Sequence, residues 1–199
     1  MKKKFKVAIT GSIGSGKSEF CKIAEKFGFV VIRADEISKQ LLSENNLVKE
    51  KVLSQFGSDS YINGKPNYKF LAEIVFSNFE KLKKLESILH PIVIKKINQL
   101  SNETLKTNDI VFIESALIYE ADIESSFDYV ILITAPREIR LQRKLQNGFS
   151  EEDFNKRELN QIPDEEKKKR ADFIFVNDKT TKELEQYFKI FCLTLNIPV

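Results

Sequence analysis

One short stretch near the N-terminus has the residue types and the spacing of a loop that binds phosphate. The pattern G-x-x-x-x-G-K-[ST] is matched at every fixed position by Gly11-Ser12-Ile13-Gly14-Ser15-Gly16-Lys17-Ser18. The three glycines let the backbone curl so that successive N–H groups point at phosphate oxygens. Lys17 can reach the β- and γ-phosphates of a nucleotide, and the Ser18 hydroxyl is a suitable ligand for Mg²⁺. The sequence therefore predicts a nucleotide phosphate site.

The segments on either side of this loop predict the strand and the helix that position it. Residues 5–10 form a short apolar, β-branched run that is typical of a buried strand. Between Lys17 and Phe27 the apolar residues recur at helical spacing, and Gly28 is expected to stop the helix. The positive N-terminal end of this helix would add to phosphate binding. A Gly/Ser-rich surface loop is the alternative, and the order strand, loop, helix argues against it.

The remaining apolar segments predict an α/β fold, a three-layer P-loop arrangement with a five-stranded parallel sheet. Four further strands are expected at residues 29–32, 109–113, 129–133 and 173–176, because continuous apolar runs separated by helices are typical of a sheet covered on both faces. Most of the chain between the second and third strands has a helical pattern, with a turn at Asn63-Gly64 and a helix break at His90-Pro91.

These elements predict one domain with two inserted parts. The core would comprise residues 1–35 and 106–199, with a helical insertion of about 36–105 between its second and third strands. A polar segment of about 144–170 would form a charged lid or an ordinary solvated helical pair. Within it, the basic run Lys167-Lys168-Lys169-Arg170 is expected on a solvated helix face.

Composition excludes several classes of protein. The 199 residues are 42% hydrophobic and 31% charged, which is typical of a globular protein, and the net charge of +3 is too small to indicate nucleic-acid binding. No run approaches the roughly 18 apolar residues that a membrane span needs. Cys21 and Cys192 are too few for a disulfide scaffold and lack metal-ligand spacing. We expect a cytoplasmic protein, without a membrane or nucleic-acid partner, that is a monomer or a weak homo-oligomer.

Residues outside the loop favour a kinase over other P-loop proteins. Asp35 follows the second strand, where the acceptor hydroxyl could lie near the γ-phosphate, although Asp35 could also act as a helix N-cap. Glu114 ends the third strand and is a candidate Mg²⁺ ligand. Phosphoryl transfer needs mainly positioning and charge neutralisation, so late arginines suit it. Those arginines are Arg137, Arg140, Arg143 and Arg157.

At this level of detail the sequence resembles the dephospho-CoA kinase family over essentially the whole chain. The resemblance rests on residues 9–18, Val31-Ile32-Arg33-Ala34-Asp35, Ile74-Val75-Phe76, Leu89-His90-Pro91, Leu117-Ile118-Tyr119-Glu120, Gln161, Ala171-Asp172 and Asn177. It implies transfer of the ATP γ-phosphoryl group to the ribose 3′-hydroxyl of dephospho-CoA, with Mg²⁺ bridging the phosphates.

The resemblance also implies roles for individual residues. The catalytic residues would be Lys17, Asp35 and Arg143. ATP would be bound by Gly11, Gly14, Ser15, Gly16, Lys17, Ser18, Glu19, Arg143 and Asn177, with the last one near adenine by analogy of fold. The substrate contacts would be Thr10, Asp35, His90 and Leu117, and the metal ligands would be Ser18 and Glu114. His90 could instead simply mark the helix break.

Four positions depart from the family pattern. The usual Asp-Ala-Asp reads Arg33-Ala34-Asp35, so Arg33 would stand beside the remaining carboxylate if the strand stays extended, and would either pair with it or contact a substrate phosphate. Glu114 replaces an aspartate, while Tyr68 and Asn147 replace expected arginines. These departures leave two alternatives, a kinase for a nucleoside or nucleotide and a nucleotide-dependent switch without transferase activity.

Overall fold

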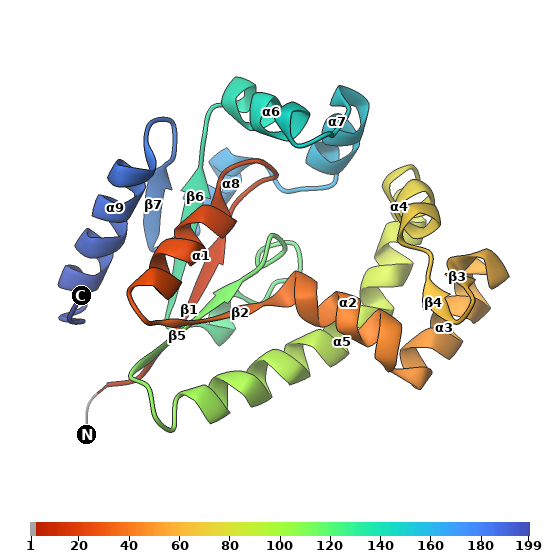
Figure 1. The fold of residues 1–199 in the computed structure, drawn as a ribbon, viewed down its shortest axis with the longest axis horizontal. Coiled ribbons are helices and arrows are strands. Elements are labelled where there is room, and N and C mark those ends of the chain that lie inside the picture. The colour runs from red at the N-terminus through yellow and green to blue at the C-terminus, as the bar shows by residue number, and fades with distance from the viewer. Residues whose placement is uncertain (1–2) are drawn as a thin grey trace. The chain divides into compact units, whose positions relative to one another are not determined.

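The computed structural model describes residues 3–199, and the chain divides into two compact units (Figure 1). The sheet unit comprises the chain up to Ile32 together with Leu100–Val199. The helical unit comprises Arg33–Gln99. The phosphate-binding loop predicted from the sequence belongs to the sheet unit.

Within residues 3–199 the sheet has five parallel strands, which confirms the predicted α/β fold. The strands are β1 (Phe5–Thr10), β2 (Val30–Arg33), β5 (Ile110–Glu114), β6 (Tyr129–Thr134) and β7 (Phe173–Val176). Their order across the sheet is β2-β5-β1-β6-β7, so β1 is central. Because the strands are parallel, the turns that follow β1, β5, β6 and β7 gather at one edge of the sheet.

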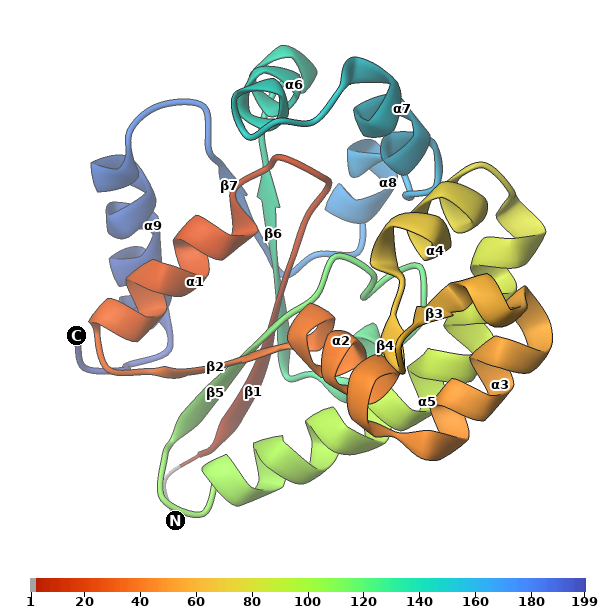
Figure 2. The ribbon, with the colours of Figure 1, turned by 45° about the vertical axis from the view of Figure 1, so that its right-hand side comes forward.

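Apolar side chains of β1 alternate between two covered faces. Val7 and Ile9 point toward α1 (Lys17–Lys26) and α9 (Thr181–Thr194), whose apolar residues pack against them. Ala8 points to the opposite face and packs with Ile118 and Val130. Figure 2 shows α1 and α9 on one side of the sheet and α8 (Asp164–Lys168) on the other. Both faces are therefore shielded from water, as the continuous apolar strands predict.

The polar segment that precedes β7 forms α6 (Arg137–Gln146), α7 (Glu151–Leu159) and α8, and the short 3₁₀ helix η2 (Glu124–Ser126) precedes β6. The expectation that the whole basic run 167–170 is solvated is wrong for its first residue. Lys167 is fully buried, and its ammonium group lies 2.8 Å from the Glu120 carboxylate. This carboxylate compensates the buried positive charge. Lys169 and Arg170 are exposed, as expected.

The helical unit contains α2 (Ala34–Glu44), α3 (Asn46–Phe56), α4 (Tyr68–Phe76), most of α5 (Phe79–Thr104) and the 3₁₀ helix η1 (Ser58–Ser60). It also contains two strands that the sequence did not predict, β3 (Tyr61–Ile62) and β4 (Lys65–Pro66), which pair antiparallel. Asn63 and Gly64 both have positive φ (49° and 79°), as a two-residue hairpin turn of type I′ requires. Strands this short carry no periodic signal.

The expected helix break at His90-Pro91 is wrong, because α5 continues through Pro91 and its ribbon bends instead (Figure 1). A proline inside a helix costs about 3 kcal/mol. Here the buried side chains of Ile88, Leu89 and Val93 flank it, and each contributes roughly 1.5–3 kcal/mol on burial. Although α5 has 26 residues, no helix among residues 3–199 has both the length and the apolar composition needed to cross a membrane.

One aromatic ring ties α9 to the rest of the sheet unit. Phe188 is fully buried, and its ring centroid lies 5.5–5.8 Å from those of Phe20, Phe27, Phe29 and Phe112. These partners come from α1, from the chain around β2 and from β5, so a single side chain joins several elements. Ring pairs of this kind stabilise beyond the area that they bury.

Replacing Phe188 with Ala is expected to lower the free energy of unfolding by about 3–5 kcal/mol, because a large cavity would replace the ring. The matched control is Ile190→Ala on the same helix, where the side chain is 53% exposed and a change below about 0.5 kcal/mol is expected. Urea unfolding followed by circular dichroism measures both. Equal losses for the two variants would show that Phe188 does not anchor α9.

Candidate nucleotide-binding site

The loop between β1 and α1 passes so close to its neighbours that glycine is required. Gly11 and Gly14 have φ of 150° and 79°, in the region that favours glycine. A Cβ on Gly11 would lie 2.0 Å from the carbonyl oxygen of Ile133, and one on Gly14 would lie 2.5 Å from that of Arg140. Both contacts are with backbone, which cannot move aside as a flexible side chain can.

The loop leads directly into the positive end of a helix. The N-cap of α1 is Gly16, which carries no side chain to cap the helix, so the positive helix N-terminus can face a ligand. Ser18 follows in the first turn, and its hydroxyl donates a hydrogen bond to Oε1 of Glu114 at 2.6 Å. Glu114 is the last residue of β5, the neighbour of β1.

Ser18 and Glu114 fit the requirements of Mg²⁺. The ion takes hard oxygen ligands, and in phosphoryl-transfer enzymes it is typically held by one or two protein groups together with substrate phosphates. The structure brings together a hydroxyl and a carboxylate, both beside the helix N-terminus. These are the two residues proposed as metal ligands from the sequence.

Lys17 lies across the loop. Its ammonium group donates hydrogen bonds to the carbonyl oxygen of Gly11 at 2.6 Å and to that of Ser12 at 3.3 Å. A lysine held in this way is directed at the concave side of the loop, where the N–H groups of a phosphate nest converge. The contacts with carbonyl oxygens can be exchanged for phosphate oxygens, which carry more negative charge.

Two residues predicted from the sequence support the second half of the loop. Asn177 follows β7 and donates from Nδ2 to the Ser15 carbonyl oxygen at 2.9 Å. The Arg143 guanidinium donates to the carbonyl oxygen of Asn177 at 3.0 Å, and to those of Gly14 and Ser15 at 3.4 Å. A Cβ on Gly16 would lie 2.0 Å from the Asn177 amide nitrogen. The structure thus brings Arg143, Asn177 and the loop together.

The first half of the loop is held by residues whose contacts the sequence did not reveal. Arg140, which is 8% exposed, donates to the Ile13 carbonyl oxygen at 3.3 Å and pairs with Glu158 at 2.7 Å. Gln161 accepts the Ile13 N–H at 2.9 Å, and Asp164 accepts a hydrogen bond from the Ser12 hydroxyl. Ser12 and Asp164 are 152 positions apart, so no local pattern links them. The sequence pointed to these residues only through the late arginine Arg140, the family position Gln161 and the predicted lid of about 144–170.

Asp35 belongs to the helical unit and lies in the first turn of α2. Its alternative role as an N-cap is wrong, because Arg33 occupies the N-cap position and Asp35 lies inside the helix. The strand does not stay extended as far as Asp35, since α2 begins at Ala34, so strand alternation does not place Arg33 and Asp35 on one side. Arg33 lies 3.9 Å from the Glu36 carboxylate. The Asp35 side chain is exposed.

Three further residues predicted to contact ligands lie in the sheet unit. Thr10 is fully buried at the end of β1, while Leu117 is half-buried beyond β5 and its N–H donates to the Ser115 hydroxyl at 3.2 Å. Glu19 lies in the first turn of α1 and pairs with Lys22 at 3.4 Å. Their contacts with ligands stay predictions.

His90 lies within α5, and two positions that depart from the family pattern, Tyr68 and Asn147, lie at helix ends. Burial lowers the pKa of His90. Glu86 raises this pKa by a smaller amount, and Lys83 lowers it further. His90 is therefore expected to be neutral at pH 7. Tyr68 begins α4 and donates to the Lys39 carbonyl oxygen at 3.3 Å. Asn147 ends α6, where its amide donates to the Arg143 carbonyl oxygen at 2.6 Å.

A parallel sheet whose central strand runs through a glycine loop into a helix is the core of the P-loop fold, which P-loop kinases share. A solved shikimate kinase from Acinetobacter baumannii shares this fold, with a TM-score of 0.52 at 15% identity over 98% of this chain and 95% of that one. A sequence profile of dephospho-CoA kinases matches residues 5–183. The chain therefore belongs to the dephospho-CoA kinase family.

Individual relatives agree with this assignment. The dephospho-CoA kinase of Protochlamydia amoebophila is 40% identical, and the match covers 91% of each chain. The solved dephospho-CoA kinase of Campylobacter jejuni is 35% identical and covers 96% of this chain and 97% of its own, with a TM-score of 0.70.

Gly16→Ala is expected to weaken ATP binding while the protein stays folded, because the new Cβ would displace the Asn177 amide from the Ser15 carbonyl oxygen. The matched control is Gly28→Ala. Gly28 also has positive φ (85°), but outside its two chain neighbours no described atom lies within 4 Å of a Cβ at that position. Calorimetric titration with ATP measures both variants, and equal ATP affinity would show that the closeness of Asn177 is not required.

Proposed function

We propose that this protein transfers the γ-phosphoryl group of ATP to the ribose 3′-hydroxyl of dephospho-CoA, giving coenzyme A and ADP. The observation that carries the proposal is the family match over residues 5–183 together with a complete phosphate-binding loop in the structure. The protein would act in the cytoplasm on a small molecule rather than on nucleic acid or a membrane, as a monomer or a weak homo-oligomer.

The donor side of the reaction would be handled by the loop. Its N–H groups and the N-terminus of α1 would cradle the phosphates, and Lys17 would leave its carbonyl partners to neutralise the β- and γ-phosphates. Arg143, which already touches the loop, would stabilise charge on the transferring group. Asn177 would keep the loop in place beside the adenine.

Ser18 and Glu114 would hold Mg²⁺, which when bound supplies charge neutralisation on the transferring phosphates. The extra methylene of Glu114 relative to the usual aspartate still lets its carboxylate reach the Ser18 hydroxyl.

The acceptor side would depend on Asp35. In a loose transition state the hydroxyl needs orientation more than early deprotonation, so one carboxylate that accepts its hydrogen bond is sufficient. Arg33, which stands where the family has a second aspartate, lies 3.9 Å from the Glu36 carboxylate. His90 and Leu117 would add contacts with the acceptor. The helical unit of residues 33–99 supports the proposed acceptor-binding insertion, and the polar helix α7 supports the proposed lid of about 144–170.

The acceptor is tested by ADP release with ATP, Mg²⁺ and one candidate acceptor at a time. Dephospho-CoA is expected to stimulate ADP release far more than AMP or adenosine, and water alone is expected to support little release. Equal stimulation by the three acceptors would favour a kinase for a nucleoside or nucleotide. Release that needs only water would instead indicate a nucleotide-dependent switch.

Asp35→Asn is expected to lower kcat by about 10²-fold or more with little change in ATP affinity, because the amide weakens the interaction that orients the hydroxyl. The matched control is Glu36→Gln, an adjacent exposed carboxylate in the same helical turn, which should retain nearly full kcat. Steady-state kinetics with saturating ATP measures both. Full activity of the Asp35 variant would reduce that residue to a stabilising charge at the start of α2.

A further inference from the structure

The segment Gln161–Lys167, which we call the α8 brace, contacts the first half of the phosphate-binding loop through two side chains. Gln161 accepts the Ile13 N–H at 2.9 Å. One carboxylate oxygen of Asp164 accepts a hydrogen bond from the Ser12 hydroxyl. A backbone donor and a side-chain donor of adjacent loop residues are thus bound by the same distant segment.

The Asp164 carboxylate is directed at the loop and the sheet rather than at its own helix. An aspartate in the first turn commonly stabilises the N-terminus of its helix. Asp164 is the first residue of α8, and its second carboxylate oxygen accepts a hydrogen bond from the Thr134 hydroxyl at 2.7 Å, at the end of β6. Ser12 and Thr134 are only 4% and 6% exposed. Because water has little access, these hydrogen bonds are strong and directional.

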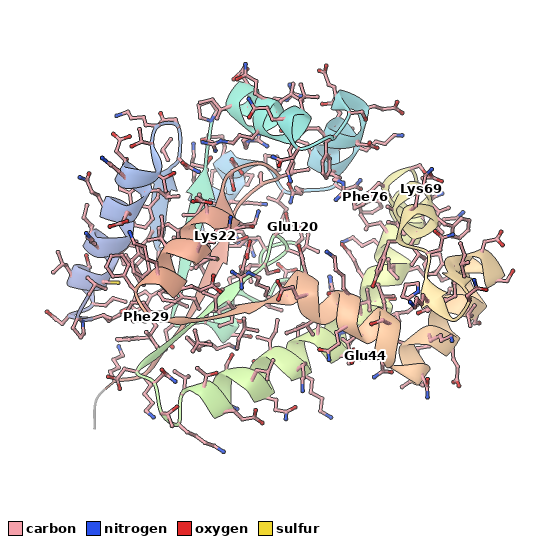
Figure 3. All side chains as sticks on the ribbon, in the orientation of Figure 1. Lys22, Phe29, Glu44, Lys69, Phe76 and Glu120 are labelled. Carbon is pink, nitrogen blue, oxygen red and sulfur yellow. The ribbon has the colours of Figure 1, made fainter. Side chains whose placement is uncertain are left out.

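The brace is fixed on its other side by one buried carboxylate. Glu120, labelled in Figure 3, lies in the loop that follows β5. Its Oε1 accepts the N–H of Ile162 at 3.0 Å and lies 2.8 Å from the ammonium group of Lys167. The side chains of Lys167 and Glu120 are 0% and 5% exposed. Glu120 therefore holds both ends of the brace, and a buried pair of this kind is costly to break.

We propose that Asp164 and Gln161 are positioning residues that hold the first half of the loop in its ATP-binding shape. The inference rests on the proposed function, because the ligand concerned is the ATP of that same site. The Ser12 hydroxyl and the Ile13 N–H both donate hydrogen bonds to the brace, and the Lys17 ammonium group donates to the Ser12 carbonyl oxygen. The Ser15 N–H donates to the Ser12 carbonyl oxygen at 3.1 Å, so the brace and this turn together set the path along which the following backbone N–H groups approach phosphate. A glycine-rich loop without this support would lose more conformational freedom on binding ATP.

The test is ATP binding by calorimetry, without acceptor, for Asp164→Ala, Ser12→Ala and the double variant. Asp164→Ala should raise the Kd for ATP by roughly tenfold or more, the size expected when a charge-assisted hydrogen bond is lost. The Kd of the double variant for ATP should be about equal to that of the single variant with the higher Kd, because both changes break the same contact. Asp164→Asn, which keeps one acceptor oxygen and can accommodate a reversed hydroxyl, should recover part of the affinity.

The matched control is Glu165→Ala, the next residue of α8, whose exposed carboxylate pairs with Lys168 and which should bind ATP like the wild type. The kinase assay should show the Asp164→Ala defect mainly in KM for ATP, with kcat within about threefold. A lower melting temperature with an unchanged Kd would make Asp164 purely structural and overturn the proposal, as would additive effects in the double variant. A wild-type protein that binds ATP but does not phosphorylate dephospho-CoA would refute the proposed function alone.

Discussion

Close approach of backbone to backbone at the turn between β1 and α1 is the constraint on which the rest of the site depends. Ile133 of β6 and Arg140 of α6 leave no space for a Cβ on Gly11 or Gly14. Glycine satisfies this geometry but makes the loop intrinsically flexible, so its shape must come from outside. Side chains from α6, the α8 brace and the end of β7 supply that support by hydrogen bonds to loop backbone and to the Ser12 hydroxyl.

Sequence reasoning succeeded where the signal is local. The loop pattern is contained in eight consecutive residues, and each strand of the main sheet is a continuous apolar run, so the α/β fold and the place of Lys17 and Ser18 followed directly. The pairing of Ser18 with Glu114 was also within reach, because residues at the carboxyl ends of adjacent parallel strands meet at one edge of the sheet.

Two of the errors, at Pro91 and at Lys167, arose because tertiary contacts overrode a local preference of the sequence. Pro91 removes one helical hydrogen bond, but buried neighbours on both sides keep α5 continuous. Lys167 belongs to a charged run that looks solvated, yet Glu120, distant in sequence, provides a buried partner. The hairpin at Asn63-Gly64 has strands too short to give a pattern. The link between Asp164 and Ser12 could not be seen at all, since only the folded chain brings them together.

The strand order also has a consequence for synthesis of the chain. β1 leaves the ribosome first, but Phe5 pairs with Ile110 and Val7 with Tyr129, so both partner strands emerge much later. At about 5–20 residues per second the apolar edges of β1 remain unpaired for several seconds or more. During that interval the nascent N-terminus offers an open template for wrong strand pairing or for a chaperone. The central position that makes β1 a rigid support for catalysis thus gives it a long wait for both of its partner strands during synthesis.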